Sequence, residues 1–254
     1  MPVIGLGTSF SYTDEAPDPV EVESTVNHAL EIGYRHIDCG PVYQNEAAVD
    51  RGIKASGISR DELFIMSKLW NTEHDPKDVE PALDRTLRDL GTDHVDLYLA
   101  SNPLRTKIHW PQSFVKLDPY TPFPKDENRS TPTVQIPLEK TWQVMEDLVT
   151  IGKVRSIGVS NFTQPQLEEI LFIARIPPAV NQIPATPYHP KGDRIEWCKS
   201  KNIHTTAWGP LTISRATQLN VTSDPVAQKI AGVDITPAQL VLSWAVQRGN
   251  KCDP

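Results

Sequence analysis

The chain has 254 residues, of which 39% are hydrophobic and 22% charged, as in an ordinary soluble globular protein with one large core. Its formal net charge of −7 argues against a broad basic face for nucleic acid, although a local cationic pocket for phosphate groups remains compatible with it. No apolar stretch is long enough to span a membrane, the N-terminus does not resemble a signal peptide, and the cysteines form no C-x-x-C pair or metal-binding cluster, so we expect a cytoplasmic protein with reduced thiols.

Short apolar runs along the chain predict seven buried β-strands. These runs are Val3–Leu6, Arg35–Cys39, Leu63–Leu69, Val95–Leu99, Ser156–Ser160, Ala179–Ile183 and His204–Trp208. Between most of them, apolar residues recur with helical spacing and predict amphipathic helices packed on the core. These helical patterns are Val22–Leu30, Val79–Leu90, Leu138–Val149, Leu167–Ala174 and Ala238–Ala245.

Alternating strands and helices imply a parallel sheet covered by helices, and both an open doubly wound sheet and a closed barrel fit that pattern. The glycine fingerprint G-x-G-x-x-G of a dinucleotide-binding open sheet follows none of the strands, since Gly5-Leu-Gly is continued by Thr-Ser-Phe. Its absence favours the barrel, and we expect residues 1–254 to form a single domain.

Residues 100–137 break this rhythm, because they show no helical period and contain many prolines. A loop of this length inside one domain is usually functional or disordered. In a barrel it would follow the strand that ends at Leu99 and overhang the face on which barrel enzymes place their active sites. It is therefore either a substrate lid or a mobile insertion, and both interpretations stay open.

Three polar side chains lie at or near the ends of early strands. Asp38 ends the second strand, Tyr43 lies in the loop just beyond it, and Lys68 interrupts the apolar third strand. A buried ammonium needs a partner, so we expect Lys68 to pair with Asp38. A neighbouring ammonium favours the phenolate, which predicts a lowered pKa for Tyr43 and a role as general acid towards a carbonyl oxygen. Each residue also has a plain alternative: a turn or cap for Asp38, packing for Tyr43, and a side chain that extends to the barrel rim for Lys68.

A series of short motifs resembles the aldo-keto reductase family, occurs in that family's order and covers nearly the whole chain. The motifs are Gly5-Leu-Gly-Thr8, Arg35–Glu46, Ser67-Lys68-Leu69, Val95–Leu99, Gly152–Phe162, Val180–Ile183 and Thr236–Gln239. The resemblance implies an α/β fold, the TIM-type (β/α)8 barrel, and an oxidoreductase that reduces a small aldehyde or ketone to an alcohol with NADPH. By the same resemblance Tyr43 would be the general acid, Lys68 would tune its pKa, and Asp38 would hold Lys68.

The resemblance also implies a set of NADP(H)-binding residues. They are Thr8, Asp38, Ser160, Asn161, Gln182 and Trp208. Within this set, Ser160, Asn161 and Gln182 would bind the nicotinamide carboxamide. Trp208 lies where the family usually has a tyrosine that stacks on the nicotinamide ring, and an indole can stack equally well.

Two departures from the family pattern stand out. The family's histidine motif, Ile-His-Trp-Pro, appears only after an eight-residue insertion behind Leu99, so Ser101 would take the strand end and His109 would be displaced into the loop. His109 then completes the catalytic set only if the loop folds back towards Tyr43. The chain also ends at Pro254, before the family's last strand, last helix and basic phosphate-binding segment, which predicts an incomplete barrel with open edges and weakened NADP(H) binding.

Three functions remain open at this point. The first is an NADPH-dependent carbonyl reductase, motivated by the intact Asp38, Tyr43 and Lys68. The second is an isomerase, cyclase or lyase that uses the same acid without a cofactor, motivated by the displaced His109 and the missing phosphate anchors. The third is a non-catalytic barrel remnant, completed by a partner strand and motivated by the open edges. We rank the reductase first; the oligomeric state and the substrate are not predicted.

Overall fold

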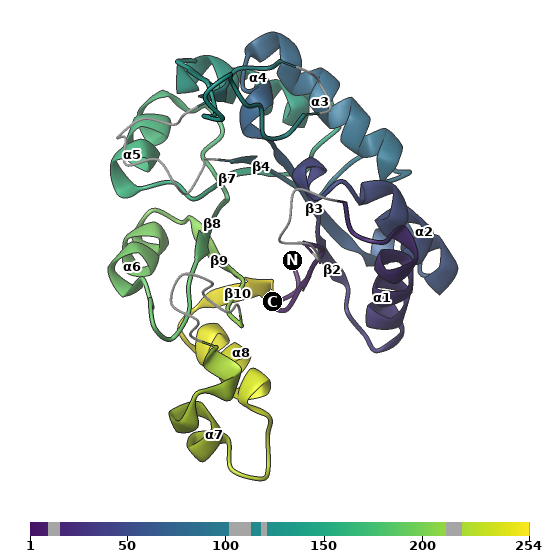
Figure 1. Ribbon diagram of the computed structural model, residues 1–254. Helices are drawn as coiled ribbons and strands as arrows, with labels where there is room; N and C mark the ends of the chain where they lie inside the picture. Colours follow the sequence, from purple (N-terminus) through teal and green to yellow (C-terminus); the bar gives the residue numbers. More distant parts are fainter. Residues whose placement is uncertain (10–15, 102–112, 118–120, 212–219, 254) are drawn as a thin grey trace.

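The computed structural model describes residues 1–9, 16–101, 113–117, 121–211 and 220–253. Eight parallel strands form one sheet in the order β1-β2-β3-β4-β7-β8-β9-β10, and helices surround its outer face (Figure 1). The strands are β1 Leu6–Gly7, β2 His36–Asp38, β3 Phe64–Leu69, β4 Leu97–Ser101, β7 Ile157–Ser160, β8 Val180–Pro184, β9 His204–Trp208 and β10 Asn250–Asp253. A separate antiparallel pair joins β5 Ser113–Phe114 to β6 Thr133–Val134. The predicted α/β barrel architecture is confirmed.

The strand β10 joins the two ends of the sheet. It pairs in parallel with β9 along its whole length. On its other side, Cys252 donates its N–H to the Val3 carbonyl at 2.9 Å and accepts the Gly5 N–H at 2.8 Å. Figure 1 shows the two chain ends lying beside each other in the barrel wall. The prediction that the eighth strand is missing and that the barrel has open edges was therefore wrong.

The composition of β10 explains why a hydrophobic pattern does not reveal it. The segment Asn-Lys-Cys-Asp contains a single apolar residue, Cys252, which is fully buried in a small cluster with Ala207 and Ala245. The Lys251 side chain, which precedes Cys252, points to the opposite face of the sheet. Backbone hydrogen bonds on both edges, rather than apolar side chains, define the strand. Within the described residues no helix follows β10.

The helices begin where the sequence carries strong N-terminal signals. Asp18 and Asp75 cap α1 and α3, and Thr163 and Thr236 form capping boxes at the starts of α5 and α8. The helices are α1 Pro19–Glu31, α2 Glu46–Ser56, α3 Pro76–Asp89, α4 Leu138–Thr150, α5 Gln164–Ile173, α6 Gly192–Ser200, α7 Pro225–Ala231 and α8 Pro237–Gln247. All five predicted helical patterns overlap one of them. Within the described ranges, none of these helices combines the length and apolar character needed to cross a membrane.

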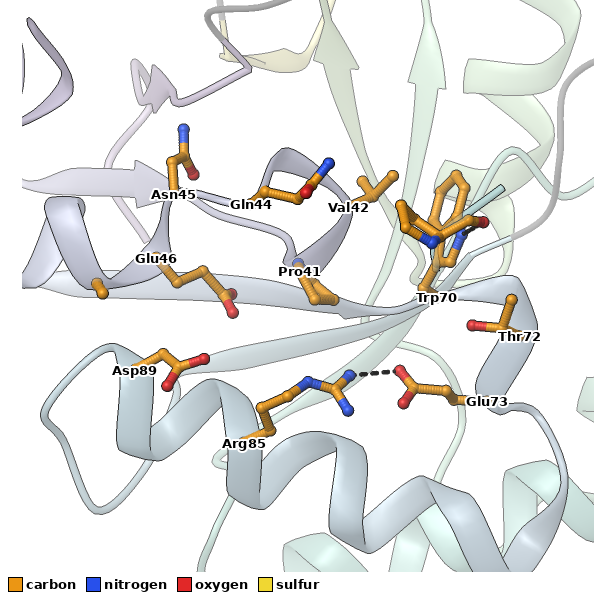
Figure 2. A pocket seen from close by; sticks show the side chains of 12 residues that line it. Pro41, Val42, Gln44, Asn45, Glu46, Trp70, Thr72, Glu73, Arg85 and Asp89 are labelled. Carbon is orange, nitrogen blue, oxygen red and sulfur yellow. Dashed lines mark hydrogen bonds and ion pairs between the residues drawn. The ribbon is translucent and has the colours of Figure 1, made fainter. Parts of the chain in front are cut away.

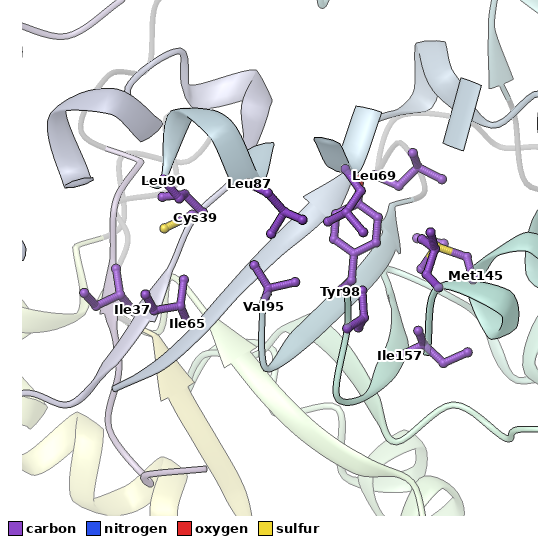
Figure 3. Packing of buried hydrophobic residues seen from close by; sticks show 14 of the residues in the cluster. Ile37, Cys39, Ile65, Leu69, Leu87, Leu90, Val95, Tyr98, Met145 and Ile157 are labelled. Carbon is purple, nitrogen blue, oxygen red and sulfur yellow. The ribbon is translucent and has the colours of Figure 1, made fainter. Parts of the chain in front are cut away.

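Most of the core lies between the outer face of the sheet and the helices. In Figure 3, strand residues such as Ile65 and helix residues such as Leu87 and Met145 belong to one buried cluster. A smaller apolar cluster comes from the other face of the strands and contains Met66, Leu97, Leu99 and Val180. Side chains alternate along a strand, so β3 directs Ile65 towards the helices and Met66 into the barrel. Lys68, two residues further on, points into the barrel as well.

The described part of the predicted loop 100–137 contacts the C-terminal end of β3. Trp70, which follows β3, donates its indole N–H to the Pro122 carbonyl at 2.6 Å. Its ring also meets Phe123 edge-on, with ring centroids 5.4 Å apart. This is the side of the barrel on which a substrate lid would lie. The role of the loop as a lid stays a prediction.

Candidate active site

Lys68 lies at the centre of a hydrogen-bonded group at the C-terminal ends of β2 and β3. Its ammonium donates to the Asp38 carboxylate, to the Cys39 carbonyl at 3.0 Å and to the Tyr43 hydroxyl at 3.1 Å. Lys68 and Asp38 are only 5% and 3% exposed. An ammonium carries three hydrogens, so each has an acceptor. The predicted pairing of Lys68 with Asp38 is confirmed.

Two opposing effects determine the charge of Lys68. Burial disfavours the ammonium, because a cation loses its hydration inside a protein. The charge of Asp38 and the oxygen of Tyr43 outweigh that effect and hold the pKa of Lys68 above its ordinary value. Lys68 therefore remains protonated throughout the neutral range.

The pKa of Tyr43 is raised above its ordinary value, which is opposite to the direction predicted from the sequence. Burial is the main cause, because it disfavours a phenolate, and the ammonium of Lys68 acts in the other direction without cancelling it. Lys68 lies 5.0 Å from the centroid of the Tyr43 ring. Tyr43 thus keeps its proton at neutral pH, and the Lys68 ammonium beside its oxygen can stabilise the phenolate that forms when the proton is transferred. That combination suits a general acid.

A single helical turn, Pro41–Tyr43, carries Tyr43 from the end of β2 to a position beside Lys68. Gln44 leaves the turn with φ of 55°, in the left-handed region. Asn45 then donates its side-chain amide to the Thr8 carbonyl at 2.7 Å, which fastens the turn to the end of β1. Asn45 is not among the site residues expected from the sequence. Its only signal in the sequence is its place in the Arg35–Glu46 motif, two residues after Tyr43.

Gln182, Asn161 and Trp208 form a second set of hydrogen bonds that reaches Asp38 from β8 and β9. Gln182 donates to the Asp38 carboxylate at 2.7 Å, and the indole of Trp208 donates to the Asn161 side-chain oxygen at 3.0 Å. Asn161 adopts a left-handed φ of 66°, and its N–H donates to the Gln182 carbonyl at 2.8 Å. Ser160, which ends β7, is buried and pairs in register with Gln182. These amide, hydroxyl and indole groups supply the donors, acceptors and flat face that a nicotinamide needs, so the set fits that group.

The other predicted site residues stand apart from this set. Thr8 is fully buried, and its hydroxyl and N–H donate to the Asp38 carbonyl at 2.8 and 3.0 Å. It therefore contacts the site through the backbone of Asp38. β4 ends at Ser101, which is buried, as expected. His109 lies outside the described residues, and its role stays a prediction.

One cavity borders the group without containing it, and a second lies away from it between two outer helices. The first, of about 260 Å³, lies against the turn that precedes α2, and its lining includes the ion pair between Arg85 and Glu73 (Figure 2). The other, of about 790 Å³, lies between the start of α4 and α5. Neither is lined by Tyr43 or Lys68, so the chemistry of the side chains rather than cavity size marks the site. In the part of the chain that the structure describes, no cluster of His, Cys, Asp and Glu could hold a metal ion.

Comparisons with known proteins agree with this geometry. A model of the Aldo/keto reductase family matches residues 3–252. The chain is 38% identical to aldo-keto reductase family 1 member A1 of Bos taurus and 40% identical to an aldo/keto reductase of Synechocystis. The two alignments cover all of this chain and 77% and 76% of the length of those relatives. Among solved structures it resembles the aldose reductases of Schistosoma japonicum and Giardia lamblia, each with a TM-score of 0.86, at 37% and 38% identity. Those alignments cover all of this chain and 78% and 82% of the two structures.

Proposed function

Because this chain belongs to the aldo/keto reductase family, we propose that Tyr43 is the general acid with which it reduces an aldehyde or ketone to an alcohol. The family makes the chain an oxidoreductase that uses a reduced nicotinamide cofactor on a small carbonyl compound. The observation that carries the assignment of Tyr43 is its 3.1 Å contact with Lys68, an ammonium paired with the buried Asp38.

In the proposed reaction a proton moves from the Tyr43 hydroxyl to the carbonyl oxygen. The reduced cofactor, when bound, supplies hydride to the carbonyl carbon. As the C=O bond becomes a single bond, its oxygen gains negative charge, takes the Tyr43 proton and leaves a phenolate. Lys68 stabilises that phenolate, Asp38 holds Lys68 in place, and water returns a proton to Tyr43. General acid help of this kind contributes roughly 100- to 10,000-fold to the rate.

We assign NADP(H) as the cofactor. Ser160, Asn161 and Gln182 would hold its carboxamide, and Trp208 would cover the nicotinamide ring. The bond from Gln182 to Asp38 at 2.7 Å supports a nicotinamide at this place, because it brings the three carboxamide-binding residues next to Tyr43 and Lys68. NADPH binding at least about tenfold tighter than NADH binding would show a charge-assisted contact to the 2′-phosphate and would support NADP(H). Equal dissociation constants would remove the assignment of NADP(H) and leave a reductase of either cofactor.

Of the alternatives raised by the sequence, the non-catalytic remnant has lost its main support. The non-catalytic remnant rested on open barrel edges, and β10 occupies that position. A cofactor-free isomerase has no observation in its favour among the described residues. We also propose a cytoplasmic location, which the buried thiols of Cys39 and Cys198 support, because reduced thiols suit a reducing compartment.

A Tyr43→Phe variant tests the proposal. It keeps the ring and loses the proton donor, so kcat for an aldehyde should fall roughly 100- to 10,000-fold. NADPH affinity, followed by quenching of tryptophan fluorescence, should change little, because Ser160, Asn161 and Gln182 are unchanged in this variant. Turnover by Tyr43→Phe at the wild-type rate would reject Tyr43 as the acid. Failure of the wild-type protein to bind NADPH or NADH at millimolar concentration would reject the reductase function itself.

A further inference from the structure

Building on the reductase function proposed above, we propose that Glu46 is a positioning residue that holds the turn carrying Tyr43 against the strand carrying Lys68. It touches no reacting atom. It acts by fixing where the Tyr43 hydroxyl lies relative to the Lys68 ammonium.

Glu46 connects three elements of the barrel. It is the first residue of α2, three positions after Tyr43, and it is 5% exposed. One carboxylate oxygen accepts the Ser67 hydroxyl from β3 at 2.7 Å, and the other accepts the Thr86 hydroxyl from α3 at 3.1 Å. Figure 2 shows Glu46 pointing from the start of α2 towards the helix that carries Arg85. The start of α2 is thus bonded to both the strand below it and the helix beside it.

The strand contact lies one residue from the catalytic lysine. Ser67 immediately precedes Lys68, and alternation along β3 places Ser67 on the helix side and Lys68 on the barrel side. A displacement of the turn relative to Ser67 is therefore a displacement of Tyr43 relative to Lys68. Asn45 fixes the same turn to β1 through the Thr8 carbonyl at 2.7 Å, but that bond does not involve the strand of Lys68. Bonds from Cys39 and Tyr43 join the earlier part of this segment to β3, and Glu46 joins its end, the start of α2, to the same strand.

A buried carboxylate is a costly way to fill space, which argues that its hydrogen bonds have a purpose beyond packing. Burial raises the pKa of Glu46 to about 7, while the hydroxyls of Ser67 and Thr86 favour its charged form. Asp89 and Arg85 on α3 have opposite and smaller influences. Both contacts of Glu46 are hydroxyls, which can donate or accept. A neutral amide of the same shape can therefore make the same two bonds, whereas alanine can make neither.

Four variants test the role, two of them at a matched control site. Glu146 on α4 is also buried, at 1% exposure, and accepts the backbone N–H groups of Arg175 and Ile176 at 2.6 and 2.9 Å. These contacts precede β8 and therefore lie at the end of the barrel opposite the strand ends that carry Asp38 and Lys68. Glu46→Ala should lower kcat roughly 10- to 100-fold, the effect of a small misplacement of a reacting group, with NADPH affinity unchanged. Glu46→Gln should restore kcat to within about threefold, and Glu146→Ala and Glu146→Gln should lower the melting temperature without lowering kcat of the folded protein.

A spectroscopic readout makes the test independent of turnover. With 3-fluorotyrosine incorporated, the Tyr43 ¹⁹F resonance is assigned by its loss in Tyr43→Phe. Glu46→Ala should shift or broaden that resonance, while Glu46→Gln and Glu146→Ala should leave it in place. An unchanged resonance and unchanged kcat in folded Glu46→Ala would overturn the positioning role, even if the wild type is an active reductase. An inactive wild type whose resonance still responds to Glu46→Ala would reject the reductase function and retain the positional coupling.

Discussion

Replacing Lys68 by methionine should destabilise the protein by about 3 to 5 kcal/mol, the usual effect of removing one partner of a buried ion pair. The Lys68 and Asp38 side chains are 7% and 4% exposed, so water cannot replace the lost ammonium at the Asp38 carboxylate. The carboxylate would keep the 2.7 Å hydrogen bond from Gln182, which compensates only part of its charge. Methionine nearly matches the volume of the lysine chain, so cavity formation adds little. Removing one partner of an exposed ion pair would instead lower the free energy of unfolding by about 0 to 1 kcal/mol, so the measurement separates a buried pair from an exposed one.

Urea unfolding followed by tryptophan fluorescence measures this loss directly. Adding Asp38→Asn to Lys68→Met removes the unpaired charge and should recover most of the stability, so the double variant should be more stable than Lys68→Met alone. The Lys68→Met protein should also lose turnover roughly 100- to 10,000-fold, because no cation remains to stabilise the Tyr43 phenolate. A stability loss below about 1 kcal/mol, or losses that simply add in the double variant, would refute the reasoning that the pair is buried and coupled.

Three further expectations concern acid stability, barrel closure and cofactor stacking. Burial lowers the pKa of His36 and of His74 to about 4. Since these folded-state pKa values lie below the ordinary value of 6.5, the stability that the two neutral histidines contribute is present above pH 6.5 and is lost as the pH falls towards 4. A pH series of unfolding curves should show this loss. In His74→Gln the loss of stability between pH 6.5 and 4 should be smaller by up to about 3 kcal/mol. Cys252→Asp would bury an unpaired carboxylate in β10 and should cost at least about 3 kcal/mol in thermal or urea unfolding, whereas Cys252→Ser should cost less; a wild-type melting temperature in Cys252→Asp would contradict the closure of the barrel by β10. Trp208→Ala should weaken NADPH binding roughly 2- to 10-fold in a fluorescence titration, and Trp208→Phe should recover part of it; equal affinities in all three proteins would exclude stacking.

The acid site could be predicted largely because its residues interrupt recognisable strands. Asp38 ends a buried strand and Lys68 breaks an apolar one, so their pairing followed from the cost of burying an unpaired charge. The direction of the Tyr43 pKa shift could not be predicted in the same way. Burial raises the pKa of Tyr43 and Lys68 lowers it, so the direction of the net shift depends on how deeply the phenol is buried, which is known only from the folded chain. In this structure the effect of burial on the pKa exceeds that of Lys68.

The contacts of Glu46 show a second limit of sequence reasoning. Ser67 and Thr86 lie 21 and 40 residues further along the chain, on a strand and a helix, and each is an ordinary polar residue in its own segment. No spacing rule connects a helix start, the outward face of a strand and the middle of another helix. Only the packing of α2 and α3 on β3 brings the three side chains together. Such ties are found by tracing the partners of buried polar atoms.

Barrel closure and the acid site are physically linked through the shortest strands of the sheet. β10 binds the Val3–Gly5 segment through the backbone of Cys252, and β1, which follows, continues to Thr8. Thr8 holds the Asp38 carbonyl with two hydrogen bonds, and the Asp38 carboxylate in turn binds Lys68 and Gln182. The bond between Asp38 and Gln182 joins β2 to β8, two strands that are not neighbours in the sheet, so its length depends on how the sheet closes. Asn250–Asp253, whose sequence least resembles a strand, therefore helps to set the geometry around Tyr43.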